Sequence, residues 1–392
     1  MNNTPYKLLP AMDKKKRLVE IALVFLKLGL VAFGGPAAHI AMMEEEFIVK
    51  RKWLTREEFV DFVGATNLLP GPNSTELVIH LGFSRGGFWG LILSGLCFIL
   101  PAMLSVLVFA ILYARHGQVK EIEGILYGIK PVTVAVILMA LIRLFKSVIK
   151  GPLPAVVAAV SVGLYLLGLP EIPLLLLAGL AVMLIKNRDK IKNRLFSLPL
   201  GAPLLLAQAL PTAAETAGKL GPGGVFFTFL KIGSFLYGSG YVLLAFLESE
   251  FVSRLGLLSN QQLLDAIAVG QFTPGPVFTT ATFVGYLLGG VPSALTATAG
   301  IFLPSFVLVF ALNPLIPKMR KSPWLGAVLD GVNAASLALM AAVSVKLGLA
   351  SVMDLPTVLI FIIAFVLMYR WKVNSFWLIL LGGLAGFLIK LI

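Results

Sequence analysis

The chain has 392 residues, of which 58% are hydrophobic and only 13% are charged, and its mean hydropathy is +0.94. A soluble domain carries about 25% charged residues, so this composition excludes a water-soluble globular protein and predicts one whose solvent is the lipid bilayer. The net charge of +13 comes from Lys and Arg clustered between apolar segments, which is typical of membrane anchoring rather than of nucleic-acid binding. The single cysteine, Cys97, excludes a disulfide framework and a cysteine-based metal site.

The first half of the chain consists of a tail and a series of apolar segments. A polar tail, 1–17, precedes a first membrane repeat, 18–187, that opens with a long helix predicted over about 18–47. A more polar stretch follows at about 55–84, with Pro70-Gly71-Pro72 at its centre. The remaining apolar segments are predicted at about 87–114, 122–148, 152–168 and 171–187.

The second half repeats this pattern after a linker, 188–224, which is basic at its start and then contains Pro and Gly. Sliding the chain by 204 residues aligns the halves without a gap, and Pro70-Gly71-Pro72 then falls on Pro274-Gly275-Pro276. The agreement indicates duplication and fusion. The second membrane repeat, 225–392, is predicted to contain equivalent segments at about 225–251, 259–288, 291–315, 325–349, 355–370 and 374–391.

The Pro-Gly-Pro stretches decide the predicted topology. About 14 residues precede each tip and about 12 follow it, and at 1.5 Å per residue neither arm crosses ~30 Å of hydrocarbon. Each stretch is therefore predicted to be a re-entrant helical hairpin, with a single broken span as the alternative. Five crossings per half would turn the second half upside down. The predicted fold is an all-α polytopic membrane protein of two inverted-topology repeats, each with about five transmembrane helices and one re-entrant hairpin.

The positive-inside rule gives contradictory orientations for this topology. The cluster from Lys14 to Arg17 favours a cytoplasmic N-terminus, and the cluster from Lys186 to Arg194 should also be cytoplasmic. Five crossings between the clusters would place them on opposite sides of the membrane. Either the segment count or one of the two signals is therefore wrong, and the orientation stays open.

The two hairpin tips are the leading candidates for a binding site, because irregular backbone at membrane depth is tolerated only where it is buried or lines water. The helix after each tip points unpaired N–H groups and its positive dipole end toward the middle of the protein, where an oxyanion could be held. Glycine breaks in the two long first helices are expected to face the tips, with close helix packing as an equal alternative. The substrate-binding residues predicted in these segments are Gly34, Gly35, Pro70, Gly71, Pro72, Asn73, Ser74, Thr75, Gly238, Ser239, Gly240, Pro274, Gly275, Pro276 and Thr279.

Charged and titratable residues provide further candidates. Lys27 and Lys231 lie at equivalent positions inside apolar runs, where a cation is costly and usually functional. Both are predicted anion ligands, with pairing to a carboxylate as the alternative. The candidates for carrying a coupling proton are Glu76, His39, Asp61 and Asp265. The carboxylates expected at the water interface are Glu44, Glu45, Glu46, Glu248 and Glu250. Three dispersed histidines argue against a metal site, and no nucleotide-binding or hydrolase motif is found, so neither an enzyme nor a cofactor is expected.

The combination of motifs resembles the chromate ion transporter family. The motifs that support the resemblance are Phe33-Gly34-Gly35-Pro36, Leu69-Pro70-Gly71-Pro72-Asn73, Leu100-Pro101, Thr273-Pro274-Gly275-Pro276 and Leu303-Pro304-Ser305. The likeness covers nearly the whole chain and implies a two-domain member that moves chromate, or sulfate, across the inner membrane. It also implies export of chromate for resistance.

Two rival functions fit the same sequence. A passive anion channel could share the architecture, and a membrane scaffold would transport nothing. The direction of transport, the coupling ion and the choice between chromate and sulfate are not determined by the sequence, and a homodimer is left open.

Overall fold

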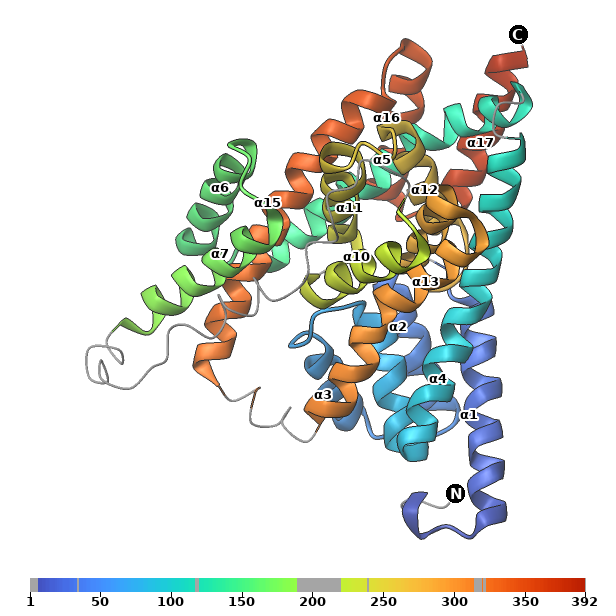
Figure 1. The fold of residues 1–392 in the computed structure, drawn as a ribbon, viewed down its shortest axis with the longest axis vertical. Coiled ribbons are helices and arrows are strands. Elements are labelled where there is room, and N and C mark those ends of the chain that lie inside the picture. The colour runs from blue at the N-terminus through green and yellow to red at the C-terminus, as the bar shows by residue number, and fades with distance from the viewer. Residues whose placement is uncertain are drawn as a thin grey trace.

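The computed structural model describes residues 6–33, 35–116, 120–188, 220–237, 240–313, 319 and 322–391, which fold into helices and connecting turns (Figure 1). The first half contains η1 (Tyr6–Leu8), α1 (Ala11–Val31), α2 (Pro36–Glu44), the π-helical η2 (Glu45–Lys50), α3 (Arg56–Thr66), α4 (Asn73–His116), α5 (Lys120–Val148), α6 (Pro152–Leu166) and α7 (Glu171–Lys186). The second half contains α10 (Pro222–Phe235), η3 (Gly240–Val242), α11 (Leu243–Leu247), the π-helical η4 (Glu248–Arg254), α12 (Asn260–Phe272), η5 (Val277–Thr279), α13 (Thr280–Leu312), α15 (Pro323–Ser351), α16 (Leu355–Trp371) and α17 (Ser375–Leu391). Most of the predicted linker, 189–219, lies outside the described residues.

The described part of the chain is a polytopic membrane protein. Its helices long and apolar enough to cross a membrane are Asn73–His116, Ile122–Val148, Val277–Leu312 and Pro323–Ser351. Large apolar side chains are also exposed on the outer faces of the shorter helices, which suits contact with lipid. This confirms the all-α membrane class that the composition predicts.

The helices α4 and α13 are each folded back at a glycine. Gly87 has φ 60° and Gly290 has φ 68°, a left-handed conformation that glycine adopts without a steric penalty. In α13 the two arms are joined across the fold by a 2.7 Å hydrogen bond between the hydroxyls of Thr282 and Thr298. Each of these helices therefore consists of a short arm, 73–86 in α4, and a long arm that continues after the glycine.

A helical hairpin forms around each Pro-Gly-Pro tip. In the first half α3 runs antiparallel to the short arm of α4, and the ring of Phe62 stacks on that of His80 with centroids 5.8 Å apart. Gly71 has φ 138° and Gly275 has φ 94°, so both tips need glycine at the turn. The helix–turn–helix shape follows the prediction, and its re-entrant position in a bilayer stays a prediction.

The long first helix predicted for each half is wrong, because the chain reverses direction at the glycine break. Phe25 of α1 contacts Phe47 of η2 with ring centroids 5.1 Å apart, and Phe229 contacts Phe251 at 5.2 Å. A continuous helix would separate such pairs by about 33 Å at 1.5 Å per residue. The reversal follows from Gly35, at φ 81°, and from the proline after it, which begins α2. The N-terminal tail, predicted to span 1–17, ends earlier than predicted, because α1 begins at Ala11.

The two halves are interlocked rather than separate bodies. Helices α16 and α17 of the second half pack along α5 of the first, and α6 and α7 of the first half pack along α15 of the second (Figure 1). The long arms of α4 and α13 pack antiparallel, because Phe88 near the start of one contacts Phe310 near the end of the other at 5.5 Å. Equivalent elements of the two halves, the long arms of α4 and α13, therefore lie side by side in opposite directions.

The largest cluster of buried apolar side chains surrounds the second-half elements α10, α11 and α12. Every side chain of α11, Leu243–Leu247, is buried.

Candidate functional site

Each hairpin tip is hydrogen-bonded to the broken first helix of the other half. The Gly71 N–H donates to the carbonyl oxygen of Leu236 at 2.7 Å, and the Gly275 N–H donates to that of Ala32 at 2.8 Å. Both donors and both acceptors are related by the 204-residue offset. The breaks therefore do face the tips, each across the boundary between the halves. Since these two N–H groups are already paired, they fix the tips in place and are not donors for a ligand.

A cavity of about 530 Å³ lies beside the two tips. Its walls come from α2, both tips, η3, α5, one residue of α15, the end of α16 and the turn that leads into α17. The predicted site residues that line it are His39, Pro72, Asn73, Ser74, Gly240 and Pro276. Tertiary folding thus brings predicted site residues from both glycine-break regions and both Pro-Gly-Pro tips to one cavity.

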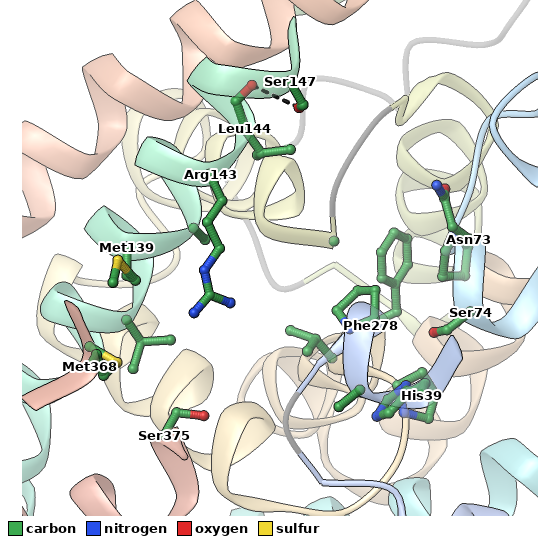
Figure 2. A pocket seen from close by; sticks show the side chains of 18 of the residues that line it. His39, Asn73, Ser74, Met139, Arg143, Leu144, Ser147, Phe278, Met368 and Ser375 are labelled. Carbon is green, nitrogen blue, oxygen red and sulfur yellow. Dashed lines mark hydrogen bonds between the residues drawn. The ribbon is translucent and has the colours of Figure 1, made fainter. Parts of the chain in front are cut away.

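Among the described residues, two cations and no carboxylate line this cavity. Arg143 extends from α5 into the open space, opposite Phe278, Asn73 and His39 (Figure 2). Lys372 lies in the turn between α16 and α17. Neither makes an ion pair with another residue of the described ranges. Because positive charge in a recess with low-dielectric walls focuses the electric field, the cavity attracts anions.

Neutral hydrogen-bonding groups complete the lining. The side chain of Asn73 donates to Asn67 at 2.8 Å, and the hydroxyl of Ser147 donates to the Leu144 carbonyl at 2.9 Å. Ser375 lies below Arg143 in Figure 2. A guanidinium presents five N–H donors in a planar fork that matches the oxygens of an oxyanion, so the chemistry of the lining fits an oxyanion and disfavours a cation.

His39, which lines the cavity, and Glu76, which does not, both contact the frame of the tips. The Nε2 of His39 lies 3.0 Å from the Ala32 carbonyl oxygen, the same oxygen that accepts from Gly275. Glu76 is fully buried. A Cβ added at Gly71 would lie 2.6 Å from its Oε1, so the Glu76 carboxyl is in contact with the tip although it does not line the cavity.

Four predicted charged residues lie away from the cavity. Lys27 is exposed on the outer face of α1, and Asp61 is exposed on α3. Lys231 is paired with Glu250 at 3.2 Å. Asp265 is buried, forms an ion pair with Lys130 at 3.3 Å and accepts a hydrogen bond from the Tyr113 hydroxyl at 2.9 Å. The structure therefore does not bring these residues to the cavity.

The other predicted residues form the frame of the tips or lie outside the described residues. Those that frame the tips without lining the cavity are Gly35, Pro70, Gly71, Thr75, Pro274, Gly275 and Thr279. The hydroxyl of Thr279 donates to the Pro276 carbonyl at 2.8 Å. Those outside the described residues are Gly34, Gly238 and Ser239.

Sequence reasoning missed Arg143. The signal was present, because Arg143 interrupts the apolar run at 122–148. Lys346 interrupts the equivalent run 203 residues later, the offset that relates α5 to α15. A cation at equivalent positions of two apolar segments is the criterion that selected Lys27 and Lys231.

The family model described as Chromate transporter matches the chain twice, over residues 19–184 and 223–387. The chain belongs to the chromate transporter family. The two matches fall on the two halves and leave the linker between them. No solved structure matches the chain.

Curated relatives cover almost the whole chain. A probable chromate transport protein of Synechococcus elongatus is 32% identical over 363 residues, which are 91% of each chain. A chromate transport protein of Cupriavidus metallidurans is 30% identical over 369 residues, 93% of this chain and 91% of its own. An uncharacterized transporter of Methanocaldococcus jannaschii is 27% identical over 397 residues and covers 96% of both chains. The resemblance predicted from the motifs is therefore confirmed.

Proposed function

We propose that this protein is a secondary transporter that carries chromate, and sulfate as a tetrahedral analogue, across the inner membrane, and that it exports chromate. The observation that supports this function most directly is the cavity at the hairpin tips, whose lining in the described part of the chain contains Arg143 and Lys372 and no carboxylate. Two positive charges balance the two negative charges of a chromate or sulfate ion. The curated relatives from Synechococcus elongatus and Cupriavidus metallidurans, both named for chromate transport, support the choice of substrate.

The inverted arrangement of the two repeats, 18–187 and 225–392, is part of this proposal. Its support is the antiparallel packing of the long arms of α4 and α13, seen in the contact of Phe88 with Phe310. If both arms cross the bilayer, the axis that relates them lies in the membrane plane, which is the geometry of an inverted repeat.

The fold-back of α1 on α2 supports a topology in which the two charge signals agree. In the proposed topology, α1 with α2, and α3 with the short arm of α4, are hairpins that begin and end on the same side of the membrane. The long arm of α4 then crosses the membrane and α5 crosses back. Helices α6 and α7 form a further pair. The number of crossings between Lys14–Arg17 and Lys186 is then even, so both clusters lie on one side, which the positive-inside rule makes cytoplasmic. Since Ser147 and Val148 at the end of α5 line the cavity, it faces the cytoplasm.

Glu76 is the proposed carrier of a coupling proton. Its carboxyl is fully buried and in contact with the tip glycine, Gly71, so a change in its charge would be transmitted to the cavity wall. We expect Glu76→Gln to retain downhill flux and to lose accumulation driven by a pH gradient. His39, Asp61 and Asp265 are the alternative carriers, and their Asn or Gln variants serve as comparisons.

The deciding experiment is uptake of radiolabelled chromate or sulfate into proteoliposomes under an imposed pH gradient. The wild-type protein should accumulate the anion above its equilibrium level. Arg143→Gln should lower uptake at least ~10-fold, because a hydrogen bond to a charged group contributes about 1.5–3 kcal/mol. The matched control is Lys146→Gln, an exposed cation on the same helix that does not line the cavity.

Three outcomes would overturn the proposal. Anion uptake by Arg143→Gln at the wild-type rate would show that the cavity is not part of the transport path. Strictly downhill flux that ignores the counter-gradient would make the protein a channel, and no flux of either anion would favour a scaffold.

A further inference from the structure

The position equivalent to Arg143 has a cation that is not free. Lys346 on α15 lies 203 residues after Arg143. Its ammonium donates to the Glu248 carboxylate and to the Ser253 hydroxyl, the latter at 2.9 Å. The Lys346 side chain is 48% exposed, whereas that of Glu248 is completely buried.

The Glu248 carboxylate lies in a set of converging donors. Besides Lys346 of α15, the Ser253 hydroxyl of η4 donates to it at 2.9 Å, and the Tyr165 hydroxyl of α6 reaches it at 3.5 Å. The donors therefore come from both halves of the chain. The sequence prediction that Glu248 lies at a water interface is wrong, since the side chain points inward to these donors.

A carboxylate and a tetrahedral oxyanion bind the same kinds of hydrogen-bond donors. Both accept charge-assisted hydrogen bonds through negatively charged oxygens, and ammonium and hydroxyl groups are suitable donors for both. A cluster of donors that holds a carboxylate is therefore also a suitable site for an oxyanion once the carboxylate moves away. The neighbouring Glu250 does not compete, because Lys231 and Arg254 hold it.

On the cavity side, no described carboxylate pairs with Arg143 in the way that Glu248 pairs with Lys346. The residue equivalent to Glu248 is Glu44, which pairs with Arg56 at 3.1 Å and has a 39% exposed side chain. Arg143 is consequently left free to face the cavity. The two equivalent cations thus differ in whether a carboxylate of the protein already occupies the binding position.

We propose that Lys346, Ser253 and Tyr165 form a second oxyanion-binding site and that Glu248 occupies it as an internal anion in this conformation. This inference rests on the proposed function of oxyanion transport. A tetrahedral dianion of the chromate or sulfate class binds first beside Arg143, and it reaches the opposite side of the protein past Lys346 when the Glu248 side chain leaves. The exchange of one anion for another on the same donors involves no covalent step.

The test counts bound sulfate on the purified full-length protein in detergent, with radiolabelled sulfate and an excess of chloride as the competitor. The wild type should bind one sulfate per chain, and Glu248→Ala should bind two because the second site is vacated. Glu248→Ala/Lys346→Gln should return to one. Arg143→Gln should bind none, and Arg143→Gln/Glu248→Ala should bind one.

A thermal-unfolding series provides the second measurement. Sulfate, but not chloride at equal ionic strength, should raise the unfolding temperature of Arg143→Gln/Glu248→Ala by several degrees and should not change that of the same protein with Lys346→Gln added. Should Glu248→Ala fail to fold, Glu248→Gln retains the side-chain volume and removes only the charge, and it should also bind two sulfates.

The results separate this inference from the proposed function. One sulfate on the wild type and still one on both Glu248 variants would overturn the second site alone. No sulfate and no chromate on the wild type would overturn the proposed function itself. A second sulfate that persists in Glu248→Ala/Lys346→Gln would place the additional site elsewhere and overturn the assignment to Lys346.

Discussion

The surroundings of Arg143 on α5 and of Lys346 on α15 are built from equivalent helices of the two halves but differ in packing and charge. On one side Arg143 faces a cavity of about 530 Å³. On the other side the equivalent Lys346 is paired with Glu248, and the adjacent Val343 and Leu347 are buried in the main core. The comparison shows that the side chains, rather than the arrangement of helices, decide which side is open.

A second pair of equivalent positions shows the same difference. Asn333 of α15 lines the cavity, and the residue 203 positions before it is Lys130. Lys130 is paired with the buried carboxylate of Asp265 at 3.3 Å. The packed side thus has two cations that are each neutralised by an internal carboxylate, whereas the open side has an amide and an unpaired guanidinium. We expect the following variants to break or sharpen this comparison.

The largest effect is expected for Gly71→Ala at the tip beside the open cavity. The backbone at φ 138° is unfavourable for alanine, and the new Cβ would lie 2.6 Å from the Glu76 Oε1. Such backbone strain costs of order 1–3 kcal/mol, and the overlap with a buried carboxyl adds to it, so chromate uptake should be lost. Gly151→Ala is the matched control, since Gly151 has φ 135° with nothing within 4 Å of the added Cβ. Equal transport by the two variants would show that the tip does not shape the site.

Breaking the ion pair on the packed side should destabilise the protein strongly. Lys130→Met leaves the Asp265 carboxylate buried without its cation, and the loss of one partner of a buried pair costs about 3–5 kcal/mol. The unfolding temperature in detergent should fall accordingly. In Lys130→Met/Asp265→Asn most of the loss should be recovered. An unchanged unfolding temperature in Lys130→Met would mean that this pair does not hold the packed side together.

A carboxylate introduced on the open side should imitate the packed side. Met139 lines the cavity one helical turn before Arg143, and glutamate at this spacing pairs with a following arginine. Met139→Glu should weaken sulfate binding about 10-fold, which corresponds to ~1.4 kcal/mol, whereas Met139→Gln should bind nearly as well as the wild type. Equal dissociation constants for both variants would show that the charge of Arg143 does not determine affinity.

The smallest effect is expected at the start of α16, where the halves differ in their helix cap. Asp354 caps α16 by accepting from the Thr357 N–H at 3.0 Å, while the equivalent cap of α6 is Gly151. The Tyr127 hydroxyl, which donates to Asp354, and the Thr357 N–H lower the pKa of this carboxyl below its usual value of 3.8. Asp354→Ala should cost about 0.5–2 kcal/mol at neutral pH.

The pH dependence of this cap has a definite sign. A carboxyl with a lowered pKa stabilises the fold above its usual pKa, and that contribution disappears as the pH falls through the folded value. The difference in unfolding temperature between the wild type and Asp354→Ala should therefore be present at pH 7 and shrink below about pH 3.8. A difference in unfolding temperature that stays constant below pH 3.8 would exclude the ionised form of Asp354 as the helix cap.

Part of the candidate site could be predicted from the sequence because it depends on local rules. Pro-Gly-Pro restricts the chain to a turn, and its repetition at a fixed offset made Pro72, Asn73, Ser74 and Pro276 candidates that do line one cavity. Arg143 could have been selected as a cation that, like Lys346, interrupts an apolar run, but its own segment does not indicate that it faces the tips.

The sequence by itself determined the helical membrane class, the two related halves and the positions of the glycine turns, because composition, offset and left-handed backbone are local properties. Only the tertiary structure decided that α1 folds back on α2, that the last helices of each half pack on the other half, and that Glu248 is buried against Lys346. A straight and a folded helix have the same periodicity, and the same lysine can face lipid, water or a carboxylate. Which of these partners a lysine meets depends on contacts between residues far apart in the chain. Those contacts pair Lys346 with Glu248 and let Arg143 face the cavity.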